Sequence, residues 1–388
     1  YEGTWEKYHK GTDFAAAEYK SDDFLQQVLT WGDELFQMGI TLNTKDNDKT
    51  VKNIDDAYGN LFNSTDLSAI QEVLFWKKYS IADNLVHSLN SNLSGGMCDA
   101  EGPAGLSQSL VDNYLNVDGS YIDPTEKKFK DFNESFKERD GRLLATVMHS
   151  GCKYKSMTVK GAKEMWVEAY SAEQKDKINP PQIVSNGNQS NITGYHIRMG
   201  IDTTYVSGQG ETSTPMIRYA EALLAYAEAA EELGKCDATV LEKTIKPLRE
   251  RAGVTYVAPS TIDPHFSDFG YAITANLQEI RRERRSELPL QGLRLDDLMR
   301  WRAHKLFQGQ RGGGAYFGAD GVLYKSIDPK NENLPTILVD NDDYLDPLKS
   351  VLPRGFQFNE GRDYLLPIPP SETSLNQELA QNPGWRKN

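Results

Sequence analysis

The sequence predicts a mainly α-helical protein, and the spacing of its apolar residues carries that prediction. Apolar side chains recur at the interval of one helix face in residues 12–38 and again in residues 215–233. Two further helices are predicted at 276–288 and 293–306. Residues 150–214 instead contain repeated glycines and a Pro-Pro pair, which predicts loops and short strands. We therefore expect a helical scaffold that carries a loop-rich face.

Bulk composition narrows the classes of function. The 388 residues are enough to bury a sizeable core. Asp plus Glu number 56 against 43 Lys plus Arg, which gives a formal charge of −13, and a field of that sign repels nucleic-acid phosphates. No apolar run reaches the roughly 20 residues that a transmembrane helix needs. We therefore expect no nucleic-acid partner and no membrane-spanning helix in this sequence.

The cysteines and histidines of the sequence predict no cofactor. Cys98, Cys152 and Cys236 are odd in number and widely spaced, which fits neither a disulfide framework nor a zinc site. We interpret them as small core or surface residues and leave one disulfide open. The six histidines show no His-x-His or His-x-x-x-His pairing, so no metal site is predicted either.

The first helix, residues 12–38, has an apolar stripe and a stop signal at Gly39. A charged loop follows. Its run from Asp46 to Asp48 is similar to the start of a calcium loop but lacks the later glycine and glutamate of an EF-hand, so we interpret it as a solvated turn. Residues 69–76 are apolar and short; a buried strand and a helix end both remain open, with Trp76 expected in the core.

The middle of the chain alternates loops with short helices. Residues 90–105 are rich in Asn, Gly and Pro, which predicts a loop long enough to carry function. Residues 106–114 are predicted as a helix that ends before a turn at Asp118-Gly119. Residues 312–361 are predicted to be extended. Their triple glycine lacks the Lys-Ser/Thr of a P-loop, so no phosphate site is expected.

A helical hairpin is predicted in the second half. Pro215 is expected to open its first helix, because proline is favoured in a first turn, and Gly234 to close it. The second helix spans about 238–251 and ends at Gly253. Alanines at close-packing positions are typical of tetratricopeptide hairpins.

Residues 281–287 carry four arginines and two glutamates. We expect Arg284 and Glu287 to bond to groups on neighbouring helices, because buried charges need partners. For Arg281, Arg282 and Arg285 there are two equal alternatives: they pair with groups on neighbouring helices, or they form a charged face exposed to solvent. Trp301 follows an apolar series and is expected in the core.

Three blocks carry a family resemblance. The first is IRYAEALLAYAEA at 217–229, and the second joins ERRSEL at 283–288 to GLRLDDLMRW at 292–301. The third is LPIP at 366–369 followed by QNPGW at 381–385. In this order and spacing they resemble the SusD/RagB family of outer-membrane nutrient-binding lipoproteins.

Two shorter segments resemble the same family. These are GLSQ at 105–108 with the following LVD, and ERDGRL at 138–143. Gly141 stands where the family usually has proline, and Trp385 where it usually has tyrosine. The tail is expected to be an extended strap, too proline-rich at 367–369 for a helix, that ends on the turn at 382–384 and packs against the helical body.

The resemblance implies a SusD-like fold in a single domain over 1–388. Residues 1–40 correspond to the remainder of an N-terminal helical region, 41–214 to the loop-rich ligand-binding part, and 215–388 to the C-terminal helical part. It further implies a cell-surface lipoprotein of the outer membrane, anchored through a cysteine upstream of Tyr1. Its partner is then a SusC-type TonB-dependent transporter, and its ligand a nutrient, above all an oligosaccharide.

A sugar site needs flat aromatic faces for C–H surfaces and short polar side chains for hydroxyls. Aromatic residues flanked by polar or glycine-containing segments, together with the polar residues of the 90–105 loop, are therefore the candidates. They are Tyr79, Asn90, Asn92, Asp99, Tyr121, Tyr154, Trp166 and Tyr205. The position of Tyr121 between the helix at 106 and the block at 138–143 resembles that of an aromatic ligand contact in some family members.

Other functions remain as alternatives. Peptide capture is the main rival within the family, and exposed backbone groups along a strand edge favour it. A glycan hydrolase requires two carboxylates across one groove, which a sequence does not reveal, and no Gly-x-Ser-x-Gly elbow is present. A scaffold that caps a transporter without binding ligand is the third. Non-catalytic capture is the prediction.

Overall fold

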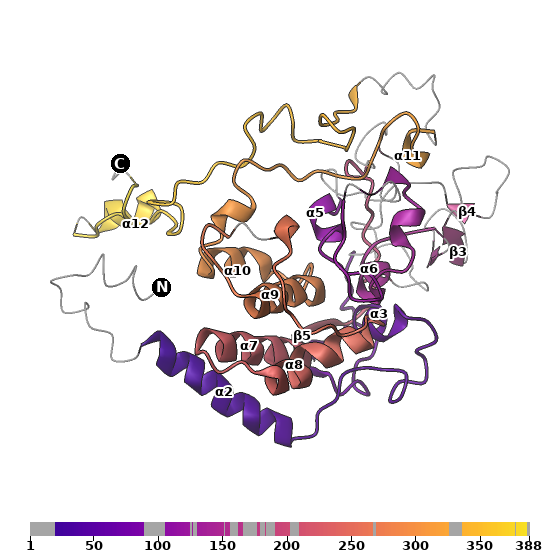
Figure 1. Ribbon diagram of the computed structural model, residues 1–388, viewed down its shortest axis with the longest axis horizontal. Helices are drawn as coiled ribbons and strands as arrows, with labels where there is room; N and C mark the ends of the chain where they lie inside the picture. The colour runs from indigo at the N-terminus through magenta and orange to yellow at the C-terminus, as the bar shows by residue number, and fades with distance from the viewer. Residues whose placement is uncertain are drawn as a thin grey trace.

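The computed structural model describes residues 20–88, 105–124, 126, 130–150, 152–155, 162–165, 177–178, 183, 191–201, 209–266, 269–325, 336–376 and 378–385. Helices dominate this part of the chain (Figure 1). The α-helices are α2 (Ser21–Gln37), α3 (Asp56–Asn63), α5 (Gln108–Val111), α6 (Gly141–Thr146), α7 (Tyr219–Glu232), α8 (Ala238–Arg251), α9 (Ala275–Glu287), α10 (Arg294–Arg300), α11 (Val322–Lys325) and α12 (Pro370–Leu375). The 3-10 helices are η2 (Glu134–Phe136), η3 (Pro264–Phe266) and η4 (His304–Leu306). The strands are β1 (Val73–Lys77), β2 (Lys153–Lys155), β3 (Ala162–Met165), β4 (Lys177–Ile178) and β5 (Thr214–Arg218).

Three long helices form layers around α7. Helix α7 packs against α2, α8 and α9, and in Figure 1 α2 and α9 lie on opposite sides of it. The helix predicted at 12–38 is not continuous: Lys20 is extended, and its backbone N–H donates to the Asp23 carboxylate at 2.9 Å. This cap fixes the helix start at Ser21. Residues 12–19 lie outside the described part of the chain.

The prediction that Pro215 opens a helix was wrong. Residues 214–218 form β5, which pairs antiparallel with β1, so the alternative left open at 69–76 resolves to a strand. Helix α7 begins at Tyr219, whose N–H donates to Glu72 O at 2.8 Å. Proline is tolerated in β5 because a two-stranded sheet leaves each strand an outer edge, where a missing N–H removes no ladder bond. Trp76 is half-buried against the core.

The other predicted helices are largely confirmed. Helix α8 spans the predicted 238–251 and ends before Gly253, which has a φ of +72°. The helix predicted at 293–306 stops at Arg300, because Arg302 adopts a φ of +51° and the Ala303 N–H bonds back to Leu298 O. Trp301 is 4% exposed, as predicted for a core residue.

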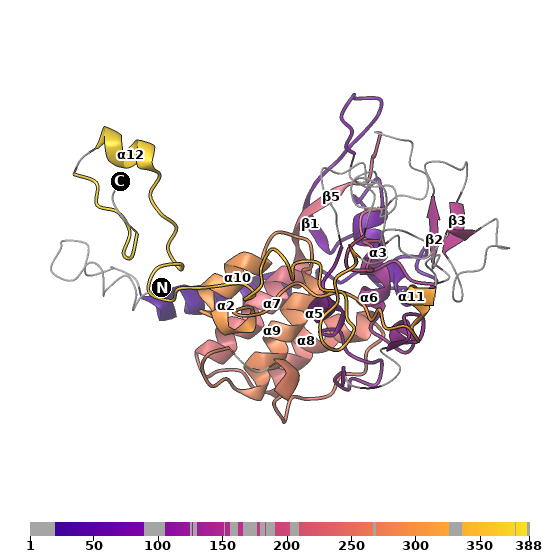
Figure 2. The same cartoon turned by 90° about the horizontal axis from the view of Figure 1, so that it is seen from above.

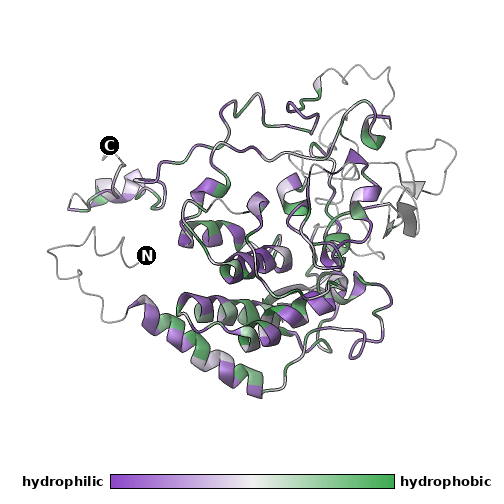
Figure 3. Cartoon of the chain, viewed as in Figure 1, coloured by the Kyte–Doolittle hydropathy of each residue, from purple (hydrophilic) through white to green (hydrophobic). Residues whose placement is uncertain are grey.

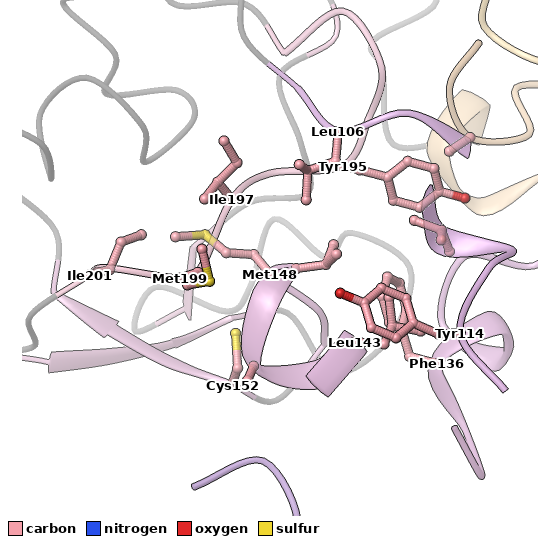
Figure 4. Packing of buried hydrophobic residues seen from close by; sticks show 14 of the residues in the cluster. Leu106, Tyr114, Phe136, Leu143, Met148, Cys152, Tyr195, Ile197, Met199 and Ile201 are labelled. Carbon is pink, nitrogen blue, oxygen red and sulfur yellow. The ribbon is translucent and has the colours of Figure 1, made fainter. Parts of the chain in front are cut away.

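The largest hydrophobic cluster lies beside the helical layers and joins α3, α5 and α6 to the segment 195–201. Figure 4 shows its side chains, with Tyr195 and Ile197 facing Leu106 and Met148. Cys152 is a buried free thiol in this cluster. Cys236 is also free, and Cys98 lies outside the described residues.

The C-terminal tail folds back on itself. Trp385 Nε1 donates to Leu365 O at 2.8 Å, and Asn382 Nδ2 donates to Leu366 O at 2.6 Å. Helix α12 follows directly after the non-helical 367–369, with Pro370 in its first turn. In Figures 1 and 2 this tail stands apart from the helical layers, and Leu366 is 80% exposed. The expectation that it packs on the body is therefore not met.

Helix α9 is hydrophilic yet buried. Figure 3 shows polar residues along much of it, although it lies between α7 and α10. Arg281 and Arg282 are 3% and 2% exposed, so the solvated alternative was wrong for both. Arg284 bonds to Asp297 of α10 at 2.7 Å, as predicted. Arg285 is half-buried and donates to Ser109 Oγ.

Glu287 lies at the centre of a buried ion network. Its carboxylate accepts from Arg142 of α6 at 3.0 Å, from Arg218 of β5 at 2.8 Å and from Arg251 of α8 at 2.5 Å. Burial raises the pKa of Glu287, but these guanidiniums, Arg251 foremost, outweigh burial and lower it to about 2. The prediction of partners on neighbouring elements is confirmed. Among the described residues, the carboxylates and guanidiniums of this network belong to Glu72, Asp140, Arg142, Arg218, Arg249, Arg251, Asp263, Glu279, Arg282, Glu283 and Glu287.

We expect Glu287→Gln to lower the free energy of unfolding by about 3–5 kcal/mol, because it leaves buried guanidinium charge uncompensated. Urea denaturation measures this. Glu34→Gln, on the exposed side of α2, is the control and should change stability by less than about 0.5 kcal/mol. Equal effects of the two substitutions would contradict the central role of Glu287.

Gly141 provides a second stability test. Its N–H donates to Ala252 O at 2.9 Å, and a Cβ there would clash with Ile54 O and lie 3.0 Å from Ala252 O. The proline usual in the family would also remove the N–H. We expect Gly141→Ala and Gly141→Pro to lower the melting temperature, with a loss on the order of 1–3 kcal/mol. Gly312→Ala, with open space around its Cβ, should have no effect.

Candidate functional site

One predicted site residue, Tyr79, lies on a two-stranded arm, defined here as residues 73–88 and 209–218. Strands β1 and β5 form its base, and the chain beyond β1 rises from the body in Figure 2. An isolated bridge between His87 and Gly210 continues the pairing, with N–H···O distances of 3.1 and 2.8 Å. A Cβ on Gly210 would lie 2.6 Å from the His87 ring, so the close approach requires glycine.

Tyr79 is the predicted ligand residue whose side chain the arm holds. It is half-buried, and its ring meets the His87 ring edge to face at 4.6 Å. Lys77 Nζ lies 4.9 Å from the Tyr79 ring centroid. His87 is itself fixed, because its Nε2 lies 2.9 Å from Thr212 O and therefore carries the proton. Tyr79 is thus an aromatic ring held in a defined orientation with polar groups beside it.

Four predicted residues lie in segments outside the described part: Asn90, Asn92, Asp99 and Tyr205. The described residues that flank those segments are nevertheless close together. Ser88 precedes the first and Gln209 follows the second, and the His87–Gly210 bridge brings these two points side by side. At the other end of the first segment, the Leu106 N–H donates to Tyr195 O at 3.0 Å. Both segments therefore leave from the arm and the adjoining core.

Tyr154 belongs to a separate sheet of order β2-β3-β4. Tyr154 lies in β2 with its backbone paired to Lys163 of β3. Its side chain and the whole of Trp166 lie outside the described residues.

Tyr121 occupies a different environment. It packs against Leu115, Ala252 and Val254, and the Arg282 guanidinium covers its ring at 4.8 Å. Its hydroxyl donates to Thr261 O at 3.3 Å, and burial raises its pKa to about 12. One ring face is therefore occupied by the ion network, and the structure does not bring Tyr121 together with Tyr79.

Sequence reasoning missed the apolar surface of the arm. Phe75 pairs with Ile217 across the strands, and these side chains are 57% and 51% exposed. Leu74 and Met216 are 41% and 58% exposed. Assigning 216–217 to a helix face hid this surface. The signal that could have found it is Pro215 beside the β-branched Ile217, which together favour an edge strand over a helix interior.

The comparisons with known proteins settle the family. The SusD family model matches residues 71–385. The chain belongs to the SusD family. A SusD-like carbohydrate-binding protein from Bacteroides fragilis has a similar structure, with a TM-score of 0.64 and 24% identity over 92% of this chain. A second SusD-like protein from Bacteroides fragilis gives a TM-score of 0.62 and 19% identity over 94% of this chain.

This SusD-family chain spans 62% of the length of each of those two proteins. At these identities the likeness concerns the fold. A search of curated proteins gives no match. Among the helices in the described residues, none is both long and apolar enough to cross a bilayer.

A cavity of about 1180 Å³ between α2, α7 and α9 lies away from the arm and includes neither Tyr79 nor Tyr121. Ion pairs line it: Arg300 bonds to Glu228 at 2.6 Å, and Trp301 Nε1 donates to the same carboxylate at 2.5 Å. Because these groups satisfy one another, we interpret this cavity as a polar seam between helices of the SusD fold.

Two histidines are buried in the core that supports the arm. His196 is 5% exposed, and burial lowers its pKa to about 3. His149 makes a tilted ring contact with Phe136, and burial of its ring together with the Arg198 charge lowers its pKa to about 4. Both are therefore neutral in the folded protein near pH 7.

We expect the SusD-family protein to lose stability as the pH falls from about 6.5. Below that pH the histidine is protonated in the unfolded chain, whereas His196 stays neutral in the folded protein. Each such histidine therefore lowers the free energy of unfolding by about 1.4 kcal/mol per pH unit. Urea denaturation at pH 7 and pH 5 tests this, and the comparison with a histidine variant cancels the contribution of carboxylates that titrate in the same range, such as Asp112, whose pKa burial raises to about 6. His196→Gln should decline less steeply than wild type; an identical decline would contradict the assignment.

Proposed function

We propose that this protein captures an oligosaccharide and does not cleave it. The observation that carries the proposal is the SusD family match over residues 71–385. A protein of similar fold, the SusD-like protein from Bacteroides fragilis, is named as carbohydrate-binding. The proposed ligand face is the arm together with the segments that leave from it.

Chemistry on the arm supports a sugar ligand. Tyr79 supplies a fixed aromatic ring, with Lys77 and His87 beside it, and aromatic rings pack on the C–H faces of sugars while polar groups bind hydroxyls. Asn90, Asn92, Asp99 and Tyr205 are proposed to complete this site. Tyr154, Trp166 and Tyr121 remain further candidates.

We also propose a cellular location and a partner for this chain, taken from the family to which it belongs. The protein would be held at the outer-membrane surface by a lipid on an upstream cysteine and would deliver its ligand to a SusC-type TonB-dependent transporter. The exposed apolar side chains of β1 and β5 are suited to contact with another protein, because patches of this kind often mark interaction sites.

Peptide capture is the second candidate, and one observation favours it. Strands β1 and β5 form a two-stranded sheet, so each has an outer edge on which an extended peptide could add a strand. Pro215 removes one donor from the β5 edge, and register shifts interrupt β1, which shortens the surface open to such pairing.

We expect Tyr79→Ala to weaken oligosaccharide binding about five- to thirtyfold, since loss of one aromatic anchor costs on the order of 1–2 kcal/mol. A glycan and peptide array identifies the ligand, and calorimetry with that ligand measures the change. Trp31→Ala removes a 63% exposed aromatic from α2, remote from the arm in sequence and fold, and should bind as wild type.

The same incubations are checked for cleavage by chromatography. Intact oligosaccharide and a loss confined to Tyr79→Ala support capture at the arm. Cleaved sugar would overturn the non-catalytic assignment, and binding of peptides alone would favour the second candidate. Binding to neither would point to a transporter-capping scaffold.

A further inference from the structure

A second cavity of about 980 Å³ lies between the loop 40–54 and the helical hairpin of α7 and α8. Its floor is apolar and includes Leu42, Leu223 and Pro247. Its rim is polar, with contributions from both the loop and α8. The cavity contains no residue of the arm.

The loop that covers this cavity is held by its own side chains. Asn43 Nδ2 donates to Ala57 O at 2.9 Å, and its N–H donates to Glu72 of the ion network at 2.8 Å. Asn47 Nδ2 donates to Leu42 O at 2.8 Å, and Asp48 accepts from Thr50 and Asn60. These bonds make the wall a pre-formed surface, which reduces the ordering cost of binding a ligand.

Tyr219 presents an unused hydroxyl to this cavity. The residue is 8% exposed and lies on the cavity wall at the start of α7. Within the described residues its hydroxyl makes no hydrogen bond, and burial alone raises its pKa. Because Tyr219 lines the cavity and a hydroxyl both donates and accepts, a ligand in the cavity could bond to it.

The remaining rim groups have mixed character. The side chains of Lys45 and Glu250 both line the cavity and are exposed, and neither side chain has an ion-pair or hydrogen-bond partner among the described residues. The basic side chains of Lys52, Lys243 and Arg251 also line it, but each is bonded to another group of the protein. Pro247 lacks an N–H, so the Lys243 carbonyl receives no bond from it. A hydroxyl both donates and accepts and can therefore bond to the ammonium and the carboxylate alike. A charged ligand would face one group of its own sign.

We propose that this cavity is a second binding site, for a neutral polyhydroxylated ligand such as a single sugar unit. The aliphatic floor takes the C–H face of the ring, and Tyr219, Lys45 and Glu250 bind its hydroxyls. The site goes beyond the function proposed for the arm, because it shares no residue with it.

The test uses NMR spectroscopy of the whole protein with its tyrosines labelled with carbon-13. Glucose, galactose and xylose are titrated, with glucuronate as a charged comparison, and Tyr219→Phe identifies the Tyr219 signal. We expect at least one neutral sugar to move that signal. Tyr219→Phe should weaken the binding of that sugar about three- to tenfold, the effect of losing one hydrogen bond.

Tyr256→Phe is the matched control, because Tyr256 packs on the same hydrophobic cluster but does not line the cavity; its affinity should equal that of wild type. Tyr79→Ala should also leave this binding unchanged, which separates failure of this site from failure of the arm. An unmoved Tyr219 signal, a response to glucuronate alone, or wild-type affinity in Tyr219→Phe would each overturn the proposal.

Discussion

The structure depends on the pairing of Glu287 with three buried arginines. Glu287 ends α9, and its partners belong to α6, β5 and α8, so one carboxylate fixes the relative positions of four segments. Buried ion pairs give specificity more reliably than net stability. Here that specificity sets where β5 ends and α7 begins, because Arg218 lies at this junction and also bonds to Glu72, next to β1. The arm is thereby oriented by the helical body.

Much of the helical scaffold followed from sequence periodicity. The residues of α8 and α9 repeat at helical intervals and are bounded by Gly253 and by the Thr274 cap, signals that depend on local backbone chemistry. The error at Pro215 has a tertiary cause. Locally, proline suits a helix start, but Arg218 and the Tyr219 N–H bond to Glu72, a residue far away in sequence. Such pairing overrides local preference.

The candidate site was less predictable than the scaffold for a related reason. Tyr79 was predicted as a candidate because it is an aromatic residue flanked by polar residues, yet the orientation of its ring depends on His87 and hence on the bridge to Gly210. The ring of Tyr121 is covered by Arg282, a contact between residues 161 positions apart that no local pattern encodes. The Tyr219 cavity arises where the 40–54 loop crosses two helices, so only the folded chain brings its groups together.

The bridge between His87 and Gly210 has a consequence for how such proteins diversify. It joins the residues that come just before 89–104 to those that come just after 202–208. Changes in length or sequence within 89–104 or 202–208 therefore leave the points of departure unaltered, and the helical body need not adjust. Substitutions in these two stretches can therefore change the proposed ligand contacts while the bridge that flanks them is kept.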